Sequence, residues 1–402
     1  MPQQIYFNKA ANRQRVDIEH GIGCLKNRFR QSFFLKTFVF RLLLINVFLL
    51  TLYNEYIVYI LKPITTWPEI KCSFSKCIKL FVVADPQILG KINENVLTRY
   101  DSDRYLRNTF SIAFEHVKPD GILFLGDLTD EGYFADDEQF ARYYERIKSI
   151  FQLKRMTNSN IPTVFIPGDN DIGGENNELI KAVVVKRFRE YFGKEEVETI
   201  DAIRILKVNK LLRTYPSNEE RTSEKLKFNI AISHVPLTDH LSPFSEQVVR
   251  DIKPEFIFSA HTHKSFALLT LKENGRRLYY EELKENAYKN KGASWSFQAA
   301  SSTNYSIVTE IVVPTCSYRM GVADMGYSVI VYGENSAEIT YYVLWLPSRF
   351  ILLLLYLIFF VIWGIIFWIN FSYLRLEIGL TNTGLSEQPV KTNKIPSPGK
   401  IP

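Results

Sequence analysis

Two long apolar segments lie near the ends of the chain, and between them apolar and polar positions alternate over short distances. Residues 351–369 are 19 consecutive uncharged residues. As a helix they would span about 28 Å, close to the roughly 30 Å hydrocarbon core of a bilayer. Residues 37–61 are also apolar but contain Arg41 and Glu55. We expect transmembrane helices at 37–61 and 349–371, with Glu55 facing the other helix or protonated.

Each apolar segment has a second interpretation. The later one has the composition of a buried core helix, although uncharged runs of this length are rare in soluble folds. The earlier one resembles a signal peptide, but a long region precedes it and no small-residue cleavage site follows it. These features favour two retained membrane anchors.

The region between the anchors, residues 62–348, has the pattern of an α/β domain. Apolar runs of strand length alternate with stretches of helical spacing up to about residue 202, and later strands follow one another more closely. The expected strands are 78–84, 121–125, 162–166, 203–208, 228–232, 256–259, 266–271, 278–283, 307–313, 327–332 and 337–344. The expected helices are 99–117, 136–155, 179–192 and 245–252, and 384–402 is expected to be disordered.

Charge is unevenly distributed over the 402 residues. Residues 1–41 hold eight basic and two acidic side chains, and residues 372–402 hold four and two. The positive-inside rule predicts that the tails 1–36 and 372–402 are cytosolic and that 62–348 lies in a secretory lumen or outside the cell. The middle region holds 36 basic and 38 acidic side chains, so we expect no nucleic-acid partner.

The cysteines fit an oxidising compartment without requiring one. Cys72 and Cys77 would close a small loop there and leave Cys316 free, while three unpaired thiols are an equally good interpretation. Cys24 lies on the expected cytosolic tail, and Asn304 begins a glycosylation sequence.

Polar clusters follow five of the expected strands. They are Asp85 with Gln87, Asp127 with Asp130, Asp169 to Asp171, His234, and His261 with His263. Sites in α/β sheets gather outside the carboxyl ends of strands, so these clusters should meet. Carboxylates at short range repel one another unless a cation lies between them. Mixed carboxylate, imidazole and amide ligands favour Mn²⁺, Fe or Zn²⁺ over Ca²⁺ or Mg²⁺, and Asp127 is the natural bridge between two ions.

Each cluster taken singly has a simpler explanation. An Asp after a strand often caps a turn, a glycine-rich run is often only a turn, and a lone histidine such as His234 is more often a core residue. His261 and His263, two positions apart at a strand end, are more suggestive. The occurrence of all five clusters in order favours a metal site.

The same clusters resemble the signature of calcineurin-like binuclear metallophosphoesterases: Asp-Pro-Gln at 85–87, Gly-Asp-Leu-Thr-Asp at 126–130, Gly-Asp-Asn-Asp at 168–171, His234, and Ala-His-Thr-His at 260–263. Trp-Pro-Glu at 67–69, Pro-Thr-Cys-Ser-Tyr-Arg-Met-Gly at 314–321 and the flanking apolar segments are similar to the membrane-bound branch that remodels GPI anchors, called metallophosphoesterase-one, and its fungal relatives. This resemblance implies a four-layer α/β/β/α sandwich flanked by two transmembrane helices.

The resemblance also implies two divalent metal ions, with Mn²⁺ favoured and Fe or Zn²⁺ as alternatives. One ion would be held by Asp85, Gln87, Asp127 and His263, and the other by Asp127, Asp169, His234 and His261. Gln87 replaces a frequent His, and Asp169 the usual Asn. Asn170 stands at the catalytic position of the His that protonates the leaving group, but an amide cannot supply a proton. His116 and His240 are alternative acids by chemistry alone.

The implied activity is removal of an ethanolamine-phosphate side branch from the mannose core of GPI anchors. The protein would be a multi-pass membrane protein of the endoplasmic reticulum, its exit sites or the early Golgi. Its substrates would be GPI lipid or GPI-anchored proteins, and export cargo receptors would be partners. The alternatives are another binuclear hydrolase, acting on phosphoproteins, nucleotides or lipids, and a weakly active adaptor for GPI-anchored cargo.

Overall fold

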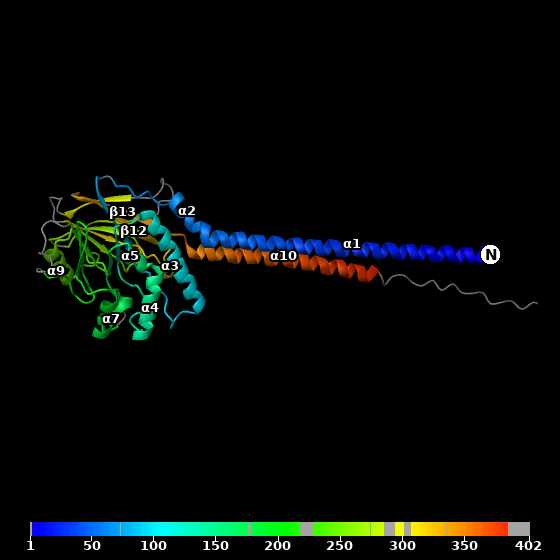
Figure 1. Ribbon diagram of the computed structural model, residues 1–402, viewed down its shortest axis with the longest axis horizontal. Coiled ribbons are helices and arrows are strands. Elements are labelled where there is room, and N and C mark those ends of the chain that lie inside the picture. Colours follow the sequence, from blue (N-terminus) through cyan, green and yellow to red (C-terminus); the bar gives the residue numbers. More distant parts are fainter. Residues whose placement is uncertain are drawn as a thin grey trace, which may run out of the picture. The chain divides into compact units, whose positions relative to one another are not determined.

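The computed structural model describes residues 2–72, 74–175, 178–217, 228–273, 275–284, 294–300, 307–334 and 336–384. The chain divides into two units, residues 53–350 and a second unit of residues 1–52 and 351–402 (Figure 1). The glycosylation sequence at Asn304 and the disordered tail expected beyond Gly384 lie outside the described residues.

Two apolar helices dominate the second unit. These are α1 (Pro2–Leu52) and α10 (Arg349–Gly384), whose first two residues belong to the other unit. A π-helical turn, η1 (Tyr53–Ile57), joins α1 to α2 (Val58–Thr65). The stretches Lys36–Thr65 and Arg349–Ser372 are long and apolar enough to cross a membrane, and few of their residues are buried. They therefore differ from core helices, while the expected membrane boundaries stay predictions.

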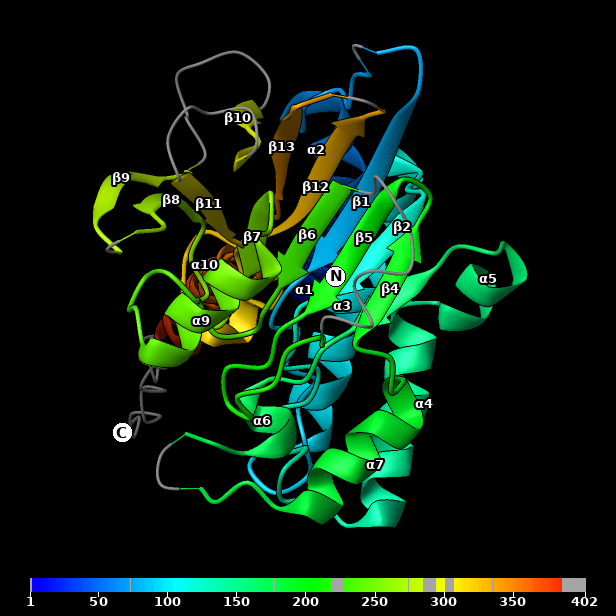
Figure 2. The same ribbon diagram turned by 90° about the vertical axis from the view of Figure 1, so that its left-hand side faces the viewer.

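Two β-sheets form the domain of residues 53–350 (Figure 2). The six-stranded sheet has the order β10 (Ser294–Gln298), β13 (Glu338–Trp345), β12 (Gly326–Gly333), β1 (Cys77–Val83), β2 (Gly121–Phe124) and β3 (Thr163–Phe165). The seven-stranded sheet has the order β4 (Val197–Ile200), β5 (Ile203–Lys207), β6 (Phe228–Ile232), β7 (Phe256–Ser259), β11 (Ile307–Val312), β8 (Phe266–Leu271) and β9 (Arg277–Glu282). Strands β1 to β3 are parallel, as are β5, β6, β7 and β11, so each sheet gathers several carboxyl ends at one edge.

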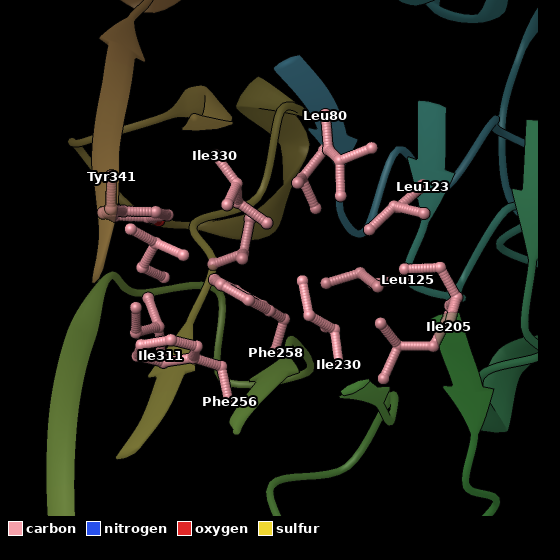
Figure 3. Close-up of a cluster of buried hydrophobic side chains, with 14 of the residues drawn as sticks. Leu80, Leu123, Leu125, Ile205, Ile230, Phe256, Phe258, Ile311, Ile330 and Tyr341 are labelled. Carbon is pink, nitrogen blue, oxygen red and sulfur yellow. The ribbon is translucent and has the colours of Figure 1, made fainter. Parts of the chain in front are cut away.

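The sheets pack face to face through one apolar core (Figure 3). Leu80 of β1 and Leu123 of β2 meet Ile205, Ile230 and Phe258 of the other sheet, and all are fully buried. Successive side chains of a strand point to opposite faces, and both faces of β1 are covered from Leu80 onward, which explains the apolar run Leu80 to Val83. Its even-numbered residues enter the core between the sheets, while its odd-numbered residues face the helices outside.

Helices cover the outer faces of both sheets. They are α3 (Val96–Val117), α4 (Asp137–Ile150), α5 (Leu153–Asn158), α7 (Ala182–Phe192) and α9 (Pro243–Ile252), while the short α6 (Asp169–Ile172) and the 3₁₀ turn η3 (Tyr318–Met320) lie in the connections between strands. Phe110 of α3 lies 5.6 Å from Phe81 of β1, measured between ring centres. On the other sheet, Val248 and Ile252 of α9 pack with Leu206. The result is the two-sheet α/β fold expected from the resemblance.

The expected strands occur with bounds within one residue of the prediction, but β4, β10 and α6 were not predicted. Strands β4 and β10 have mostly exposed or half-buried side chains, so they lack the apolar run that identifies a buried strand. The single helix expected at 136–155 is wrong, because the left-handed backbone of Gln152 (φ 51°) separates α4 from α5. The helix expected from Leu179 begins at Ala182.

The structure also decides between the two interpretations of the cysteines. Cys72 and Cys77 form a disulfide, with Cα atoms 5.9 Å apart, immediately before β1. Cys316 is a buried free thiol and Cys24 an exposed one. The small loop is therefore closed, and Cys316 stays unpaired.

Candidate metal centre

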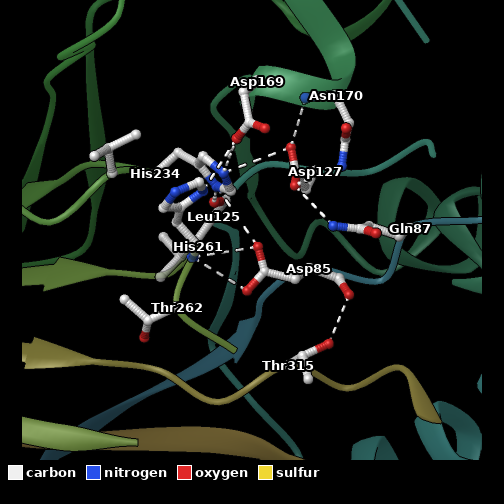
Figure 4. Close-up of polar contacts among 12 residues, drawn as sticks. Asp85, Gln87, Leu125, Asp127, Asp169, Asn170, His234, His261, Thr262 and Thr315 are labelled. Atoms are coloured by element: carbon white, nitrogen blue, oxygen red, sulfur yellow. Dashed lines mark hydrogen bonds and ion pairs between the residues drawn. The ribbon is translucent and has the colours of Figure 1, made fainter. Parts of the chain in front are cut away.

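The polar clusters expected from the sequence meet at the carboxyl ends of five strands (Figure 4). Asp85 and Gln87 follow β1, Asp127 follows β2, α6 begins with Asp169 after β3, His234 follows β6, and His261 follows β7. The backbone N–H of His261 faces the Asp85 carboxylate, at 3.2 Å from Oδ2, across 176 residues of sequence. The packed sheets thus bring distant segments into one site.

Asp169, His234 and His261 form one group of converging donor atoms. Nε2 of His234 lies 2.9 Å from Oδ1 of Asp169, and Nδ1 of His261 lies 3.1 Å from the same oxygen. Nδ1 of His234 contacts the carbonyl oxygen of Leu125 at 2.8 Å. A neutral imidazole that donates from Nδ1 to this carbonyl keeps a lone pair on Nε2, as a metal ligand must.

Asp85, Asp127 and His234 form the second group. Oδ1 of Asp127 lies 3.5 Å from Nε2 of His234. Gln87 Nε2 donates to Oδ2 of Asp127 at 2.8 Å, and Asn170 donates to the same carboxylate from its backbone N and from Nδ2, both at 3.0 Å. Asp127 thus lies beside His234, which both groups share, and this is the place expected for a carboxylate between two ions.

Gln87 and His263 are placed differently from the other expected ligands. Turning the Gln87 amide by 180° presents its oxygen where Nε2 now faces Asp127, so this side chain can serve as a ligand. Within the described residues, His263 belongs to neither converging group, although the Asp85 charge acts on it. The ligand roles stay a prediction. The structure shows that five of the expected ligands lie close together, namely Asp85, Asp127, Asp169, His234 and His261.

Five of the expected ligands have a left-handed backbone. Asp85, Gln87, Asp127, His261 and His263 have φ values between 39° and 67°. This conformation costs of the order of 1–3 kcal/mol for each non-glycine residue and persists only where the surrounding fold enforces it. Its concentration at these strand ends is typical of a functional site.

Two glycines allow the strand ends to approach closely. A Cβ atom on Gly168 would lie 2.1 Å from Oδ1 of Asp127, and one on Gly126 (φ 91°) would lie 2.7 Å from Nδ1 of His234. Both distances are far below van der Waals contact. The Gly-Asp pairs of the sequence therefore reflect the space that the site requires.

Asp171 is a buried carboxylate that joins two loops of the site. Oδ2 accepts from the backbone N of Leu128 at 3.1 Å and of Gly168 at 3.0 Å, and Oδ1 accepts from the backbone N and the hydroxyl of Thr129. Asp171 belongs to one of the predicted clusters, but the sequence pattern predicts no role for it. These bonds fix the loops that carry Asp127 and Asp169.

Glu175 belongs to the site although no sequence motif predicts it. Its Oε1 lies 2.8 Å from Nε2 of His261, on the far side of the imidazole from Asp169. It follows the Asp169–Asp171 cluster closely in sequence, but no spacing rule marks it. A carboxylate on the outer nitrogen of a ligand histidine fixes the tautomer and raises its basicity.

The electrostatics of the centre reflect crowded acids. Burial raises the pKa of Asp127 well above its usual range, and burial also raises the pKa of Asp85. Burial alone would lower the pKa of His234, but Asp127 and the other carboxylates raise it to about 10. In the same way, burial would raise the pKa of Asp169, but hydrogen bonds from His234 and His261 lower it.

These pKa shifts indicate that the centre is suited to bind cations. A cluster that draws protons onto buried carboxylates and onto an imidazole lacks positive charge at its middle. Divalent cations supply that charge, and the carboxylate, imidazole and amide donors match Mn²⁺, Fe or Zn²⁺. Asp169, His234 and His261 would hold one ion, Asp85, Gln87 and His263 the other, and Asp127 both.

The two histidines considered as alternative acids lie elsewhere. Nε2 of His116 contacts the carbonyl oxygen of Pro68 at 2.9 Å, and its ring lies against Trp67. His240 has a side chain that is 91% exposed, and its Nδ1 pairs with Asp239. Within the described residues neither belongs to a converging group, so the structure offers no support for either as the acid.

Comparisons with known proteins agree with this chemistry. Residues 78–265 match the family described as calcineurin-like phosphoesterase. The Metallophosphoesterase 1 homolog of Caenorhabditis elegans is 25% identical in an alignment of 278 positions that covers 58% of this chain and 73% of that protein. Metallophosphoesterase 1 of Ailuropoda melanoleuca is 28% identical over 188 residues, which are 45% of this chain and 46% of that protein.

A yeast protein with a different name and one solved structure also resemble this chain. Cell division control protein 1 of Saccharomyces cerevisiae is 26% identical in an alignment of 246 positions that covers 49% of this chain and 48% of that protein. The chain thus matches about half the length of the yeast and Ailuropoda relatives. The purple acid phosphatase PPD1 of yellow lupin aligns over 64% of this chain and 50% of its own, with 11% identity and a TM-score of 0.41, too low to carry a conclusion.

The family match covers the region from β1 to His263, and the converging Asp and His side chains of this region are the donors that such an enzyme needs. The chain therefore contains a calcineurin-like phosphoesterase domain, the domain of metal-dependent phosphoester hydrolases.

Proposed function

We propose that this protein is a phosphodiesterase that removes ethanolamine phosphate from the mannose core of GPI anchors in the early secretory pathway. The convergence of Asp85, Asp127, Asp169, His234 and His261 is the observation that carries the hydrolytic part. Relatives named Metallophosphoesterase 1, together with the sequence resemblance to the GPI-remodelling branch, support the choice of substrate.

The residues of the centre have different roles in the proposed phosphoester hydrolysis. Bound divalent cations would supply the activation of water and the neutralisation of charge at phosphorus. Asp127, held by two hydrogen bonds from Asn170, keeps a fixed orientation between the two groups of ligands. Asp171 fixes the two loops, and Glu175 orients His261. Because these side chains are already positioned, little reorganisation is needed during the reaction.

Asn170 has a positioning role in this proposal rather than that of an acid. It donates two hydrogen bonds to Asp127, and an amide has no proton to give a leaving group. The leaving group in the proposed reaction is a sugar hydroxyl. Protonation of this oxygen would come from solvent, so we expect activity without a histidine at this position.

The two apolar helices support a membrane-bound substrate. Each is long enough to cross a bilayer, and anchoring confines the catalytic domain to the surface where a lipid-linked glycan lies. With basic tails on the cytosolic side, the domain would face the lumen of the endoplasmic reticulum or early Golgi.

Two other functions make different predictions. A weakly active adaptor for GPI-anchored cargo would tolerate loss of Asp127 without loss of cargo export. Another binuclear hydrolase, acting on phosphoproteins, nucleotides or other lipids, would have the same chemistry but leave GPI glycans unchanged when it is removed.

Mass spectrometry of GPI glycans tests the proposal. Cells that lack the protein should accumulate glycans with one additional ethanolamine phosphate. Re-expression of the full chain should remove it, and re-expression of Asp127→Asn at the same level should not. Unchanged glycans would contradict the GPI substrate, while hydrolysis of a soluble diester by the purified full chain would still establish the general activity.

A further inference from the structure

Four charged side chains mark the place where both apolar helices join the catalytic domain. Arg349 Nη1 lies 3.1 Å from Oε1 of Glu55, and Arg349 Nε lies 3.1 Å from Oδ2 of Asp101; Arg104 also pairs with Glu55. No charged residue occurs between Arg41 and Glu55, or between Arg349 and Arg375. These four residues therefore lie where both uncharged runs end.

Helix α3 runs alongside α2 and places its N-terminal end at this junction. The two helices point in the same direction, because Glu55 contacts Arg104, the ring of Tyr59 lies 6.0 Å from that of Tyr105, and Trp67 lies against His116. The first turn of α3 is consequently at the end of the pair where Tyr53 begins the domain. Val96 and Leu97 precede Asp101 by five and four residues, or about 8 Å at most.

This first turn and the loop before it expose apolar side chains. Ile92, Val96, Leu97 and Tyr100 are between 63% and 81% exposed. Leu97 and Tyr100 share a helix face with Asp101 and Arg104, the residues that contact Arg349 and Glu55. An exposed apolar surface on the domain, within about two helical turns of the residues that contact Glu55 and Arg349, has one natural neighbour, the lipid that the apolar helices enter.

The exposure of these residues is imposed by the fold. The buried carboxylate of Glu131 accepts from the backbone N of Ile92 at 3.0 Å and of Asn93 at 2.9 Å, and Glu94 pairs with Arg319. The loop is therefore held with Ile92 pointing outward. Lys91 and Arg99 add positive charge beside the apolar residues, as expected next to lipid phosphates.

We propose that Ile92, Val96, Leu97 and Tyr100, here called the α3 wedge, insert into the surface of the bilayer that the apolar helices cross. This rests on the membrane anchoring in the proposed function. Tyrosine and aliphatic side chains at such a depth match the composition of membrane interfaces. Gln87 lies five residues before Ile92, so the wedge holds the metal centre at a fixed distance from the lipid surface and directs it toward lipid-linked phosphodiesters.

Spin-label accessibility in proteoliposomes tests the wedge. The full chain with Cys24→Ser, whose remaining free thiol Cys316 is buried, is labelled at Leu97→Cys and reconstituted into phosphatidylcholine vesicles. Leu278→Cys, an exposed apolar site on the edge strand β9, is the matched control, and Phe360→Cys on α10 reports the bilayer. We expect the Leu97 label to be several-fold more accessible to oxygen than to a water-soluble nickel complex, as at Phe360, and the Leu278 label to show the reverse.

Each other outcome overturns the proposal in a recognisable way. A Leu97 label exposed to the nickel complex, with the Phe360 label in lipid, would leave the anchoring intact and remove the wedge. A Phe360 label in water would remove the anchoring and the wedge together. Dipolar broadening between Leu97 labels would assign the surface to a second copy of the chain.

A kinetic comparison tests the consequence of the wedge. Leu97→Glu places a charge at the most exposed position of the wedge, outside the metal centre. We expect hydrolysis of a vesicle-embedded phosphodiester to fall several-fold, with hydrolysis of a water-soluble diester unchanged. If Leu97→Glu changed hydrolysis of the two substrates by the same factor, this would contradict a role of the wedge in orienting the domain.

Discussion

Nε2 of His261 lies 2.8 Å from Oε1 of Glu175, while Nδ1 of the same ring lies 3.1 Å from Oδ1 of Asp169. The imidazole is thus held between two carboxylates, one inside the group of ligands and one outside it. This is the arrangement by which proteins fix the orientation of a ligand histidine.

Replacing Glu175 by Gln should weaken metal binding without unfolding the protein. The amide is a weaker acceptor for the imidazole N–H, and loss of such an outer partner lowers metal affinity or activity by about 10–100-fold. Titration calorimetry with Mn²⁺ on the full chain measures the affinity. The matched control is Glu334→Gln, because Glu334 is similarly exposed and paired, but with Lys76. Equal affinities in the two variants would show that Glu175 has no effect on His261.

Replacing Asp171 by Ala should destabilise the domain. Three backbone N–H groups and one hydroxyl lose their acceptor in a buried place, and each unsatisfied group costs about 1–3 kcal/mol. After partial relaxation we expect a loss of about 3–5 kcal/mol in the free energy of unfolding. Denaturant unfolding followed by fluorescence measures it. Asp171→Asn, which keeps one acceptor, should lose less, and an unaffected Asp171→Ala would contradict the role in joining the loops.

The stability of the metal-free protein should fall as the pH rises. The pKa of His234 is raised in the folded state to about 10 from 6.5, so its contribution to stability is complete below about pH 6.5 and is lost as the pH rises toward 10. The raised pKa values of Asp85 and Asp127 act in the same direction, because the folded state holds their protons more tightly. Thermal unfolding in a chelator between pH 6.5 and 10 checks this. Added Mn²⁺ should abolish most of the decline in the unfolding temperature. An unfolding temperature in chelator that does not change with pH would contradict mutual repulsion among the buried carboxylates.

Much of the fold could be predicted from the sequence because the buried strands contain short, purely apolar runs. The residues Leu80 to Val83 and Ile122 to Phe124 face apolar surroundings on both sides, so no polar position interrupts these runs. Strand β10 was missed because its side chains are half-buried or exposed and its pairing depends on β13, a partner distant in sequence.

The centre was predictable only where strand ends carry polar clusters. Asp127 and His234 could be predicted because each closely follows an apolar run that the sequence identifies as a strand. Glu175 was not, since its role depends on a loop that returns to His261 from another sheet. The contacts of His116 with Pro68 and Trp67 likewise come from tertiary packing, which no local pattern reports.

The metal content of the purified full chain tests the central claim most directly. After equilibration with Mn²⁺ and removal of free ion, elemental analysis should find two ions per wild-type chain and fewer in Asp127→Asn, the bridging position. Diester hydrolysis should fall by more than about 100-fold in that variant, beyond the range of an outer partner, with an unchanged circular dichroism spectrum. A folded wild-type chain that retains only traces of divalent ion would contradict the account.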